Sequence, residues 1–197
     1  MRAVVLFVKA PVAGFVKTRL AKEIGKIPAV ILYRALAQQT HRVASVLPKT
    51  KILLAYQSHP ALPRPTWLSP TSPWFHQHGK GLGERLVHAF GRAFQNGAGP
   101  VVVIGTDLPT LTPQRLAEAF RALQKVAVVL GPSQDGGYYL IGLRSPQPQL
   151  FSNISWSSPK VFKQTLFAIK KSHLSCHLLP LERDIDTMQD IRTLITK

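Results

Sequence analysis

A basic segment near the N-terminus has the residue types that bind polyphosphate. Lys9, Lys17 and Arg19 surround a turn at Gly14, and Thr18 is expected to cap the helix that follows. Backbone N–H groups at a helix N-terminus, the helix dipole and charge-assisted hydrogen bonds all favour bound phosphate. The glycine spacings of a dinucleotide fingerprint and of a P-loop are absent. The segment therefore indicates a phosphate site, with a solvated basic turn as the alternative.

The chain is poor in acidic residues, and its aspartates lie in short motifs. Only 9 residues are Asp or Glu, against 25 Lys and Arg. Asp107 closely follows a run of valines, and Asp186 lies in an acidic segment near the C-terminus. Carboxylates so placed suit Mg²⁺, which binds through one or two carboxylates plus phosphate oxygens. We expect the two carboxylates to converge on one cation. An Asx turn at Asp107 and a helix cap at Asp186 are the alternatives.

Two glycine-bearing motifs would let the backbone approach a ligand closely. One consists of Asp135, Gly136 and Gly137, and a tight turn is its simpler interpretation. The other spans residues 81–86 and opens a helix, where ordinary surface residues are the alternative. Either motif can combine a structural role with ligand binding.

The composition is globular, with a strong positive charge. Hydrophobic residues make up 45% and charged residues 17% of the 197 residues. The net charge of +16 favours partners that carry phosphate, such as nucleotides, nucleic acid or anionic lipid, and solubility alone is the alternative. The seven histidines match no metal-ligand pattern, and Cys176 has no recognisable catalytic partner. These observations argue against a zinc hydrolase and a cysteine nucleophile.

The sequence also favours a cytoplasmic location. Cys176 is the only cysteine, so it cannot form an internal disulfide. The apolar run at residues 3–8 is shorter than the apolar region of a signal peptide. No segment approaches the roughly 18 apolar residues that a membrane helix requires. We therefore expect a protein without a membrane span, and its oligomeric state is left open.

Strand and helix patterns alternate along the chain. Apolar runs predict strands at 3–8, 51–56, 74–77, 101–104, 126–130, 138–143 and 176–179, and a short edge strand around Trp67. Capping signals and helical spacing predict helices that begin near residues 18, 28, 82, 113, 159 and 186.

This alternation predicts a single α/β domain over residues 1–197, built on a mostly parallel sheet. Ligands of such sheets bind beyond the carboxyl ends of the strands. We expect 3–8 and 101–104 to be adjacent or near-adjacent central parallel strands, so that Lys9 and Asp107 face one cleft.

Six motifs together resemble an uncharacterised glycosyltransferase-like family, associated with radical-SAM proteins, in the nucleotide-diphospho-sugar transferase superfamily. The motifs are FVKAPVAGFVKTRL at 7–20, GLGERL at 81–86, GTDLP at 105–109, DGGYYLIGL at 135–143, ISWSS at 154–158 and DIDTMQDI at 184–191. The KTRL element at 17–20 is also similar to 2-phospholactate guanylyltransferase. The resemblance implies a GT-A domain, a three-layer sandwich around a mostly parallel sheet.

The resemblance also implies roles for individual residues. Those expected to contact the nucleotide are Lys9, Gly14, Lys17, Thr18, Arg19, Gly83, Glu84 and Arg85, and those expected to contact the acceptor are Asp135, Gly136, Gly137 and Trp156. Lys17 and Asp107 are expected to be catalytic, and Asp107 and Asp186 to share Mg²⁺ or Mn²⁺. Asp107 is followed by Leu108 and Pro109, so the DxD pair of metal-dependent glycosyltransferases is absent.

The leading hypothesis is metal-dependent transfer of a nucleotidyl group from an NTP to a small phosphorylated or anionic acceptor. The metal ion and the basic segment would neutralise the developing charge. A glycosyltransferase with a nucleotide-sugar donor is the second hypothesis. The third is a non-catalytic protein that binds nucleic acid or nucleotides. Trp67, Trp74 and Trp156 are not interleaved with basic residues in an RNA-recognition pattern, which disfavours nucleic acid.

Overall fold

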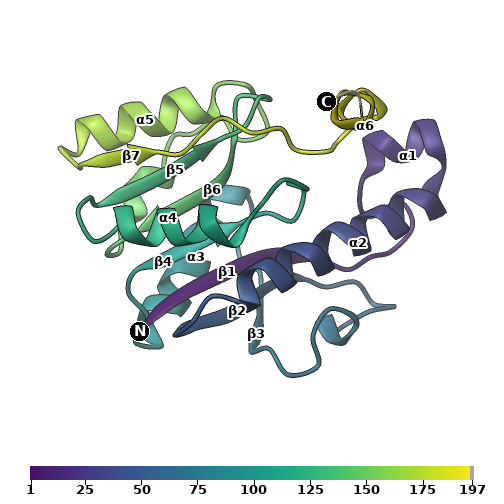
Figure 1. Cartoon of the computed structure of the whole chain (residues 1–197), viewed down its shortest axis with the longest axis horizontal. Helices are drawn as coiled ribbons and strands as arrows, with labels where there is room; N and C mark the ends of the chain where they lie inside the picture. The colour runs from purple at the N-terminus through teal and green to yellow at the C-terminus, as the bar shows by residue number, and fades with distance from the viewer. Residues whose placement is uncertain (196–197) are drawn as a thin grey trace.

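A single seven-stranded sheet runs through the computed structural model, which describes residues 1–195 (Figure 1). The strands are β1 Arg2–Lys9, β2 Thr50–Gln57, β3 Trp74–His76, β4 Val101–Ile104, β5 Val128–Pro132, β6 Tyr138–Leu143 and β7 Cys176–Leu178, in the order β3-β2-β1-β4-β6-β5-β7. β6 is antiparallel to both of its neighbours, and the other described pairings are parallel. The predicted mostly parallel sheet is confirmed.

The two strands that carry the candidate site are central neighbours. β1 and β4 pair in parallel, with Val4 opposite Val102 and Leu6 opposite Ile104. Their carboxyl ends therefore lie at the same edge of the sheet, where the chain continues to Lys9 on one side and Asp107 on the other. This arrangement confirms the prediction made from the two apolar runs.

Helices cover both faces of the sheet (Figure 1). They are α1 Thr18–Ile24, α2 Lys26–Ser45, α3 Leu82–Gln95, α4 Pro113–Ala122, α5 Val161–Lys171 and α6 Met188–Ile195, with short 3₁₀ segments η1 Pro65–Trp67 and η2 Pro148–Phe151. Side chains alternate across a strand, so Val4 and Leu6 pack with α2 and α4 while Ala3 and Val5 pack with α3. The result is the predicted three-layer sandwich.

Some local predictions were wrong. Trp67 lies in η1 and not in an edge strand, because Pro65 provides no N–H for a ladder and begins a 3₁₀ turn instead. α5 begins at Val161, two residues after the expected Pro159. α4 begins at Pro113 as predicted, and the Thr112 hydroxyl caps it by accepting the N–H of Arg115 at 3.2 Å. Among the helices described, none is long and apolar enough to cross a bilayer.

Candidate functional site

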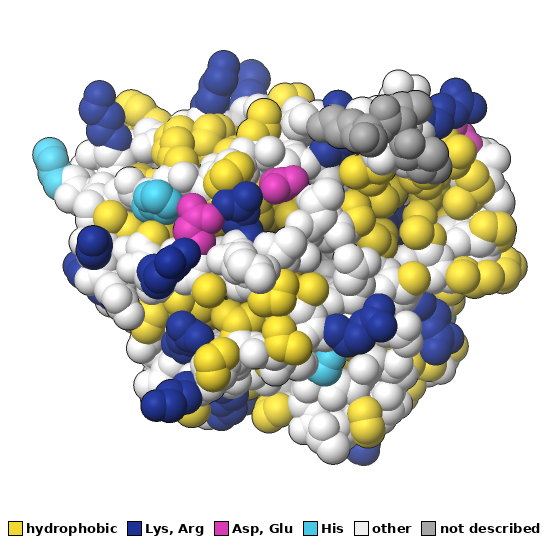
Figure 2. All heavy atoms as spheres, in the orientation of Figure 1, with side chains coloured by type: hydrophobic (Ala, Val, Ile, Leu, Met, Phe, Trp, Pro, Cys, Tyr) yellow, Lys and Arg dark blue, Asp and Glu magenta, His cyan; other side chains and the backbone are white. Residues whose placement is uncertain are grey.

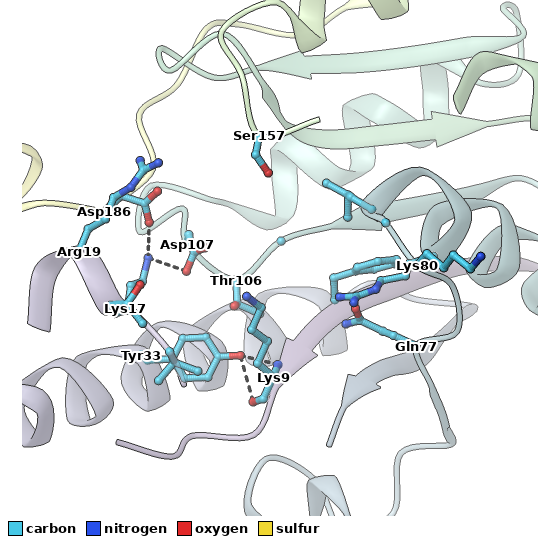
Figure 3. A pocket seen from close by; sticks show the side chains of 17 residues that line it. Lys9, Lys17, Arg19, Tyr33, Gln77, Lys80, Thr106, Asp107, Ser157 and Asp186 are labelled. Carbon is cyan, nitrogen blue, oxygen red and sulfur yellow. Dashed lines mark hydrogen bonds and ion pairs between the residues drawn. The ribbon is translucent and has the colours of Figure 1, made fainter. Parts of the chain in front are cut away.

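The carboxyl ends of β1 and β4 open on a cavity of about 600 Å³, which we name the basic cavity (Figure 3). Its lining residues are Phe7, Lys9, Val16, Lys17, Thr18, Arg19, Tyr33, Gln77, Lys80, Gly81, Leu82, Arg85, Gly105, Thr106, Asp107, Ser157 and Asp186. Seven of the residues predicted from the motifs lie here: Lys9, Lys17, Thr18, Arg19, Arg85, Asp107 and Asp186. Segments far apart in the sequence thus form one site.

Lys17 joins the two predicted carboxylates (Figure 3). Its Nζ lies 2.7 Å from Oδ1 of Asp107 and 3.1 Å from Oδ1 of Asp186, and it also donates a hydrogen bond to the carbonyl oxygen of Ile185. The Lys17 side chain is 3% exposed, so the alternative of a solvated basic turn does not hold for this residue. The two acids therefore converge, as predicted, around a lysine ammonium group.

The backbone of Lys17 also differs from the prediction. Lys17 has φ 48° and ψ 43°, a left-handed conformation that is uncommon for a residue with a side chain. It occupies the N-cap position of α1, and Thr18 is the first helical residue. The expected cap at Thr18 was therefore wrong. The sharp turn at Lys17 lets its side chain reach Asp107 while Thr18 and Arg19 remain exposed at the cavity.

The electrostatics keep Lys17 charged. Burial alone would lower the pKa of Lys17, but the charges and hydrogen bonds of Asp107 and Asp186 outweigh burial and raise it above its ordinary value. The ammonium group in turn offsets the repulsion between the two carboxylates. The three groups therefore form one ion-paired unit, in which a single ammonium group faces two carboxylates.

The carboxylates have free surface for a divalent cation. The side chains of Asp107 and Asp186 are 40% and 45% exposed, although both contact Lys17. Within residues 1–195, no group of three or more His, Cys, Asp or Glu side chains could hold a metal ion. Two carboxylates can hold Mg²⁺ or Mn²⁺ when phosphate oxygens and water complete the coordination. The donor set therefore suits an ion that arrives with a nucleotide.

Asp186 does not cap α6, contrary to the alternative drawn from the sequence. Oδ2 of Asp190 accepts the N–H of Thr187 at 2.8 Å and that of Asp186 at 3.1 Å. Oγ1 of Thr187 accepts the N–H of Asp190 at 3.4 Å, which completes a capping box before Met188. The cap thus belongs to Thr187 and Asp190, and the Asp186 side chain is left for the cavity.

Hydrogen bonds fix the segments that meet at the site. The N–H of Ile185 donates to the carbonyl oxygen of Asp107 at 2.9 Å, which fastens the C-terminal segment to the loop after β4. The Tyr33 hydroxyl accepts the N–H of Lys9 at 2.7 Å and donates to its carbonyl oxygen at 3.2 Å, so α2 holds the end of β1. Burial raises the pKa of Tyr33, which keeps the hydroxyl protonated as a donor.

A second cavity, of about 660 Å³, contains other predicted residues. We name it the aromatic cavity; its lining residues are His78, Gly79, Gly81, Gly83, Glu84, Val87, His88, Phe151, Ser152, Asn153, Ile154 and Trp156. Gly83, Glu84 and Trp156 therefore face this cavity and not the basic cavity. Gly14 lines neither cavity, and its φ of 83° assigns it to the turn after β1.

A third cavity, of about 280 Å³, contains Asp135. We name it the acidic hollow; its lining residues are Arg19, Ser133, Gln134, Asp135, Arg183, Asp184, Asp186, Thr187 and Asp190. The N–H of Gly137 donates to Oδ1 of Asp135 at 2.9 Å, so the predicted turn is present. Gly136 has a φ of 85°, and a side chain there would meet Pro159. The predicted acceptor residues Asp135 and Trp156 thus lie in different cavities.

Asp184 is an acidic side chain that the sequence did not mark as a site residue. Its Oδ2 accepts the Ser133 hydroxyl at 3.2 Å. Burial raises the pKa of Asp184 to about 7, the charges of Asp107 and Asp135 add to the increase, and the Ser133 hydrogen bond opposes it. Asp184 is therefore harder to ionise than Asp190, whose pKa is lowered in the same hollow.

The family model described as an uncharacterized protein conserved in bacteria (DUF2064) matches residues 38–158, more than half of the chain. The chain belongs to this family. A crystal structure from Desulfovibrio desulfuricans G20, provisionally described as a nucleotide-diphospho-sugar transferase, is 34% identical with a TM-score of 0.92. The alignment covers 98% of this chain and 87% of that chain. No curated protein matches the chain.

Two more distant structures share the fold of this DUF2064 protein. CMP:2-keto-3-deoxy-manno-octonic acid synthetase complexed with CTP has a TM-score of 0.60 and 10% identity, over 100% of this chain and 99% of that chain. The inositol-1-phosphate CTP transferase of T. maritima has a TM-score of 0.59 and 12% identity, over 99% and 93%. The predicted GT-A-like fold is thus confirmed. The links to radical-SAM proteins and to 2-phospholactate guanylyltransferase stay predictions.

Several residues that line the basic cavity were not predicted from the sequence. Gln77 and Lys80 come from the loop between β3 and α3, next to a motif that was recognised. Tyr33 lies within α2 and Ser157 within the ISWSS motif. The adjoining motif could have revealed Lys80 and Ser157. Tyr33 carries no local signal, because an aromatic residue in a helix usually belongs to the core.

Proposed function

We propose that this DUF2064 protein transfers a nucleotidyl group from an NTP to a small phosphorylated or anionic acceptor, using a divalent cation. One observation carries the proposal: cationic side chains from separate segments meet two carboxylates at the carboxyl ends of β1 and β4. Both the position of this cavity and its charge suit a nucleoside triphosphate.

Phosphate binding is supported by the charged groups around the basic cavity. Lys9, Arg19, Lys80 and Arg85 line it together with the buried Lys17. Arg85 is partly oriented already, since its Nε donates to the carbonyl oxygen of Gly79 at 3.2 Å. Such groups form charge-assisted hydrogen bonds with phosphate oxygens.

Asp107 and Asp186 are the residues that would hold Mg²⁺ or Mn²⁺. When bound, the ion would supply charge neutralisation to the triphosphate and the leaving pyrophosphate. Lys17 compensates the carboxylates before a nucleotide arrives, because its Nζ contacts both. This lysine therefore keeps the two acids close together without an ion.

In the proposed reaction, an acceptor oxygen forms a bond to the α-phosphorus of the NTP. The bond from that phosphorus to the oxygen bridging to the β-phosphorus breaks, and pyrophosphate leaves with the electron pair. Lys9 and Arg19 would bind the negative charge that collects on pyrophosphate. An acceptor phosphate that is already ionised needs no side chain to remove a proton.

Glycosyl transfer from a nucleotide sugar is the second candidate. It is favoured by the description of the 34% identical D. desulfuricans protein. Against it, Leu108 is 5% exposed and Pro109 follows, so the chain offers no second carboxylate at the position of a DxD pair.

The distribution of positive charge on the face seen in Figure 2 does not favour nucleic-acid binding. Figure 2 shows Lys and Arg side chains spread over the viewed face of the molecule, not gathered in one patch. Nucleic-acid binding typically needs a basic patch or stripe. The viewed face has no such concentration of charge among its described residues.

Isothermal titration with and without MgCl₂ or MnCl₂ tests the proposal. The ligands are ATP, GTP, CTP and UTP on one side, and UDP-glucose and GDP-mannose on the other. We expect cation-dependent binding of at least one NTP, followed by pyrophosphate release when a panel of sugar phosphates is added. Binding of nucleotide sugars alone would favour glycosyl transfer, and binding of neither group would contradict both functions.

A further inference from the structure

The aromatic cavity adjoins the basic cavity through a shared wall. Gly81 lines both cavities. Ser157 lines the basic cavity, and the preceding residue, Trp156, lines the aromatic cavity. A ligand with phosphate in the basic cavity could therefore extend past this wall into the aromatic cavity.

The two cavities differ sharply in charge. Among residues 1–195, no Lys or Arg lines the aromatic cavity, in a protein with a net charge of +16. Its one carboxylate, Glu84, accepts the N–H of Lys80 at 2.9 Å. The polar part of the wall also contains Asn153, Ser152 and the histidines His78 and His88, and burial lowers the pKa of His88, which favours its neutral form. The cavity therefore suits an uncharged group and not a second phosphate.

Apolar surface makes up the other part of the wall. Trp156, Phe151 and Val87 contribute it, and Val87 is 37% exposed. A pyranose ring has an apolar C–H face and hydroxyl groups around its edge. Such a ring matches a wall that places an indole beside neutral hydrogen-bonding side chains.

Trp156 is held in place on several sides. A side-chain carbon at Gly83 would lie 2.6 Å from its Nε1, so only glycine allows the indole to pack this closely on α3. Tyr138 contacts it edge to face, with ring centroids 6.4 Å apart. Gln164 of α5 accepts the N–H of Ser155 at 2.7 Å and so anchors the preceding residue. The indole is a preorganised part of the cavity wall.

We propose that the aromatic cavity binds a sugar ring against Trp156, while a phosphate attached to that sugar lies in the basic cavity near Lys80 and Arg85. This inference deepens the proposed function and rests on it, since it names the class of the transferred or accepting group. The sugar can belong to a sugar phosphate acceptor or to a nucleotide-sugar donor.

Isothermal titration with matched ligand pairs tests the inference. One pair is glucose 1-phosphate against inorganic phosphate, and the other is UDP-glucose against UDP. We expect the sugar-bearing member of at least one pair to bind about fivefold to tenfold more tightly, as expected of one aromatic contact with a ring. A gain in the first pair alone identifies an acceptor, and a gain in the second alone identifies a donor.

Two variants assign this gain to the aromatic cavity. Trp156→Ala removes the indole, and Val87→Phe fills part of the cavity from the surface of α3. Each is expected to abolish the sugar-dependent gain and leave NTP affinity unchanged. Val46→Phe is the matched control, because Val46 is 64% exposed and lines neither cavity.

The outcomes separate this inference from the proposed function. If neither sugar-bearing ligand gains affinity, or if the gain survives both cavity variants, the inference is wrong even when NTPs bind. If no NTP binds but the sugar-dependent gain is present and lost in the variants, the sugar site stands and nucleotidyl transfer is wrong.

Discussion

The Nζ atom of Lys17 lies 2.7 Å from a carboxylate oxygen of Asp107, and the lysine side chain is 3% exposed. This pair connects the loop after β1 to the loop after β4. Lys17 contacts Asp186 as well, so one ammonium group links three segments. A residue placed in this way contributes to both the fold and the proposed nucleotide site.

Lys17→Ala is expected to lower the free energy of unfolding by about 2 kcal/mol, because Asp107 and Asp186 lose the charge that compensates them. Urea denaturation measures the change. Lys22→Ala is the control, since Lys22 is an exposed residue of the same helix. Equal unfolding midpoints for both variants would contradict the structural role of Lys17.

Arg19→Ala is expected to weaken NTP binding by about 1.5–3 kcal/mol, which is the typical free-energy contribution of a hydrogen bond to a charged group. The side chain is exposed, so the thermal midpoint should hardly change. Arg121→Ala, an exposed arginine of α4 outside the basic cavity, serves as the control in titration calorimetry. Unaltered NTP affinity in Arg19→Ala would remove this residue from the proposed site.

Asp186 and Asp190 are expected to behave in opposite ways. Asp186→Asn should abolish cation-dependent NTP binding with little loss of stability, because Asp186 is not the cap of α6. Asp190→Ala should cost about 1 kcal/mol of stability, because it removes the side chain that accepts two backbone N–H groups before α6. Paired measurements of NTP affinity and unfolding midpoint check both. A larger stability loss in Asp186→Asn than in Asp190→Ala would reverse the assignment.

Asp184 should make stability depend on pH. Its folded pKa of about 7 lies above the ordinary value of 3.8, so between these values the folded protein holds a proton that the unfolded chain has released. The contribution of this group to stability therefore falls as pH rises through that window. Asp184→Asn should flatten this part of the dependence of the urea midpoint on pH. An unchanged slope would show that Asp184 titrates normally.

Two glycines of α3 provide a matched test of the Trp156 contact. Gly83→Ala should displace the indole and lower stability, because the added carbon would lie 2.6 Å from Nε1 of Trp156 and 2.8 Å from the carbonyl oxygen of Phe151. Gly91→Ala should raise stability by about 0.5–1 kcal/mol, since nothing lies within 4 Å of the added carbon. Thermal denaturation of the two variants compares them. A stabilised Gly83→Ala would mean that Trp156 moves aside without cost.

The central strands could be predicted from sequence because their apolar runs fit only a position buried on both faces. Val101–Ile104 is an example, with all four residues buried. Helix boundaries were less certain where capping side chains compete. Asp186 and Thr187 are both suitable N-cap residues, and only the hydrogen bonds of Asp190 determine that Thr187 is used.

The sequence predicted which charged residues belong to the candidate site, but it did not predict how they are arranged in space. Lys17 and Asp107 were found through short motifs, yet no motif indicates that the lysine is buried between two acids. Asp135 and Trp156 were assigned to one acceptor site and lie in separate cavities. Distances between such segments depend on the packing of whole layers, which local patterns do not encode.

Because Ile185 is fastened to Asp107, the complete site includes a segment that follows all seven strands in the sequence. Chains emerge from the ribosome N-terminus first, so β1, β2 and β4 can pair before residues 184–186 exist. β7 is then added at the edge of the sheet beside β5, without passing between strands already in place. The carboxylate of Asp186 can reach Lys17 only after β7 has been made. A chain that has emerged only as far as β7 therefore cannot complete the basic cavity, because Asp186 is still missing.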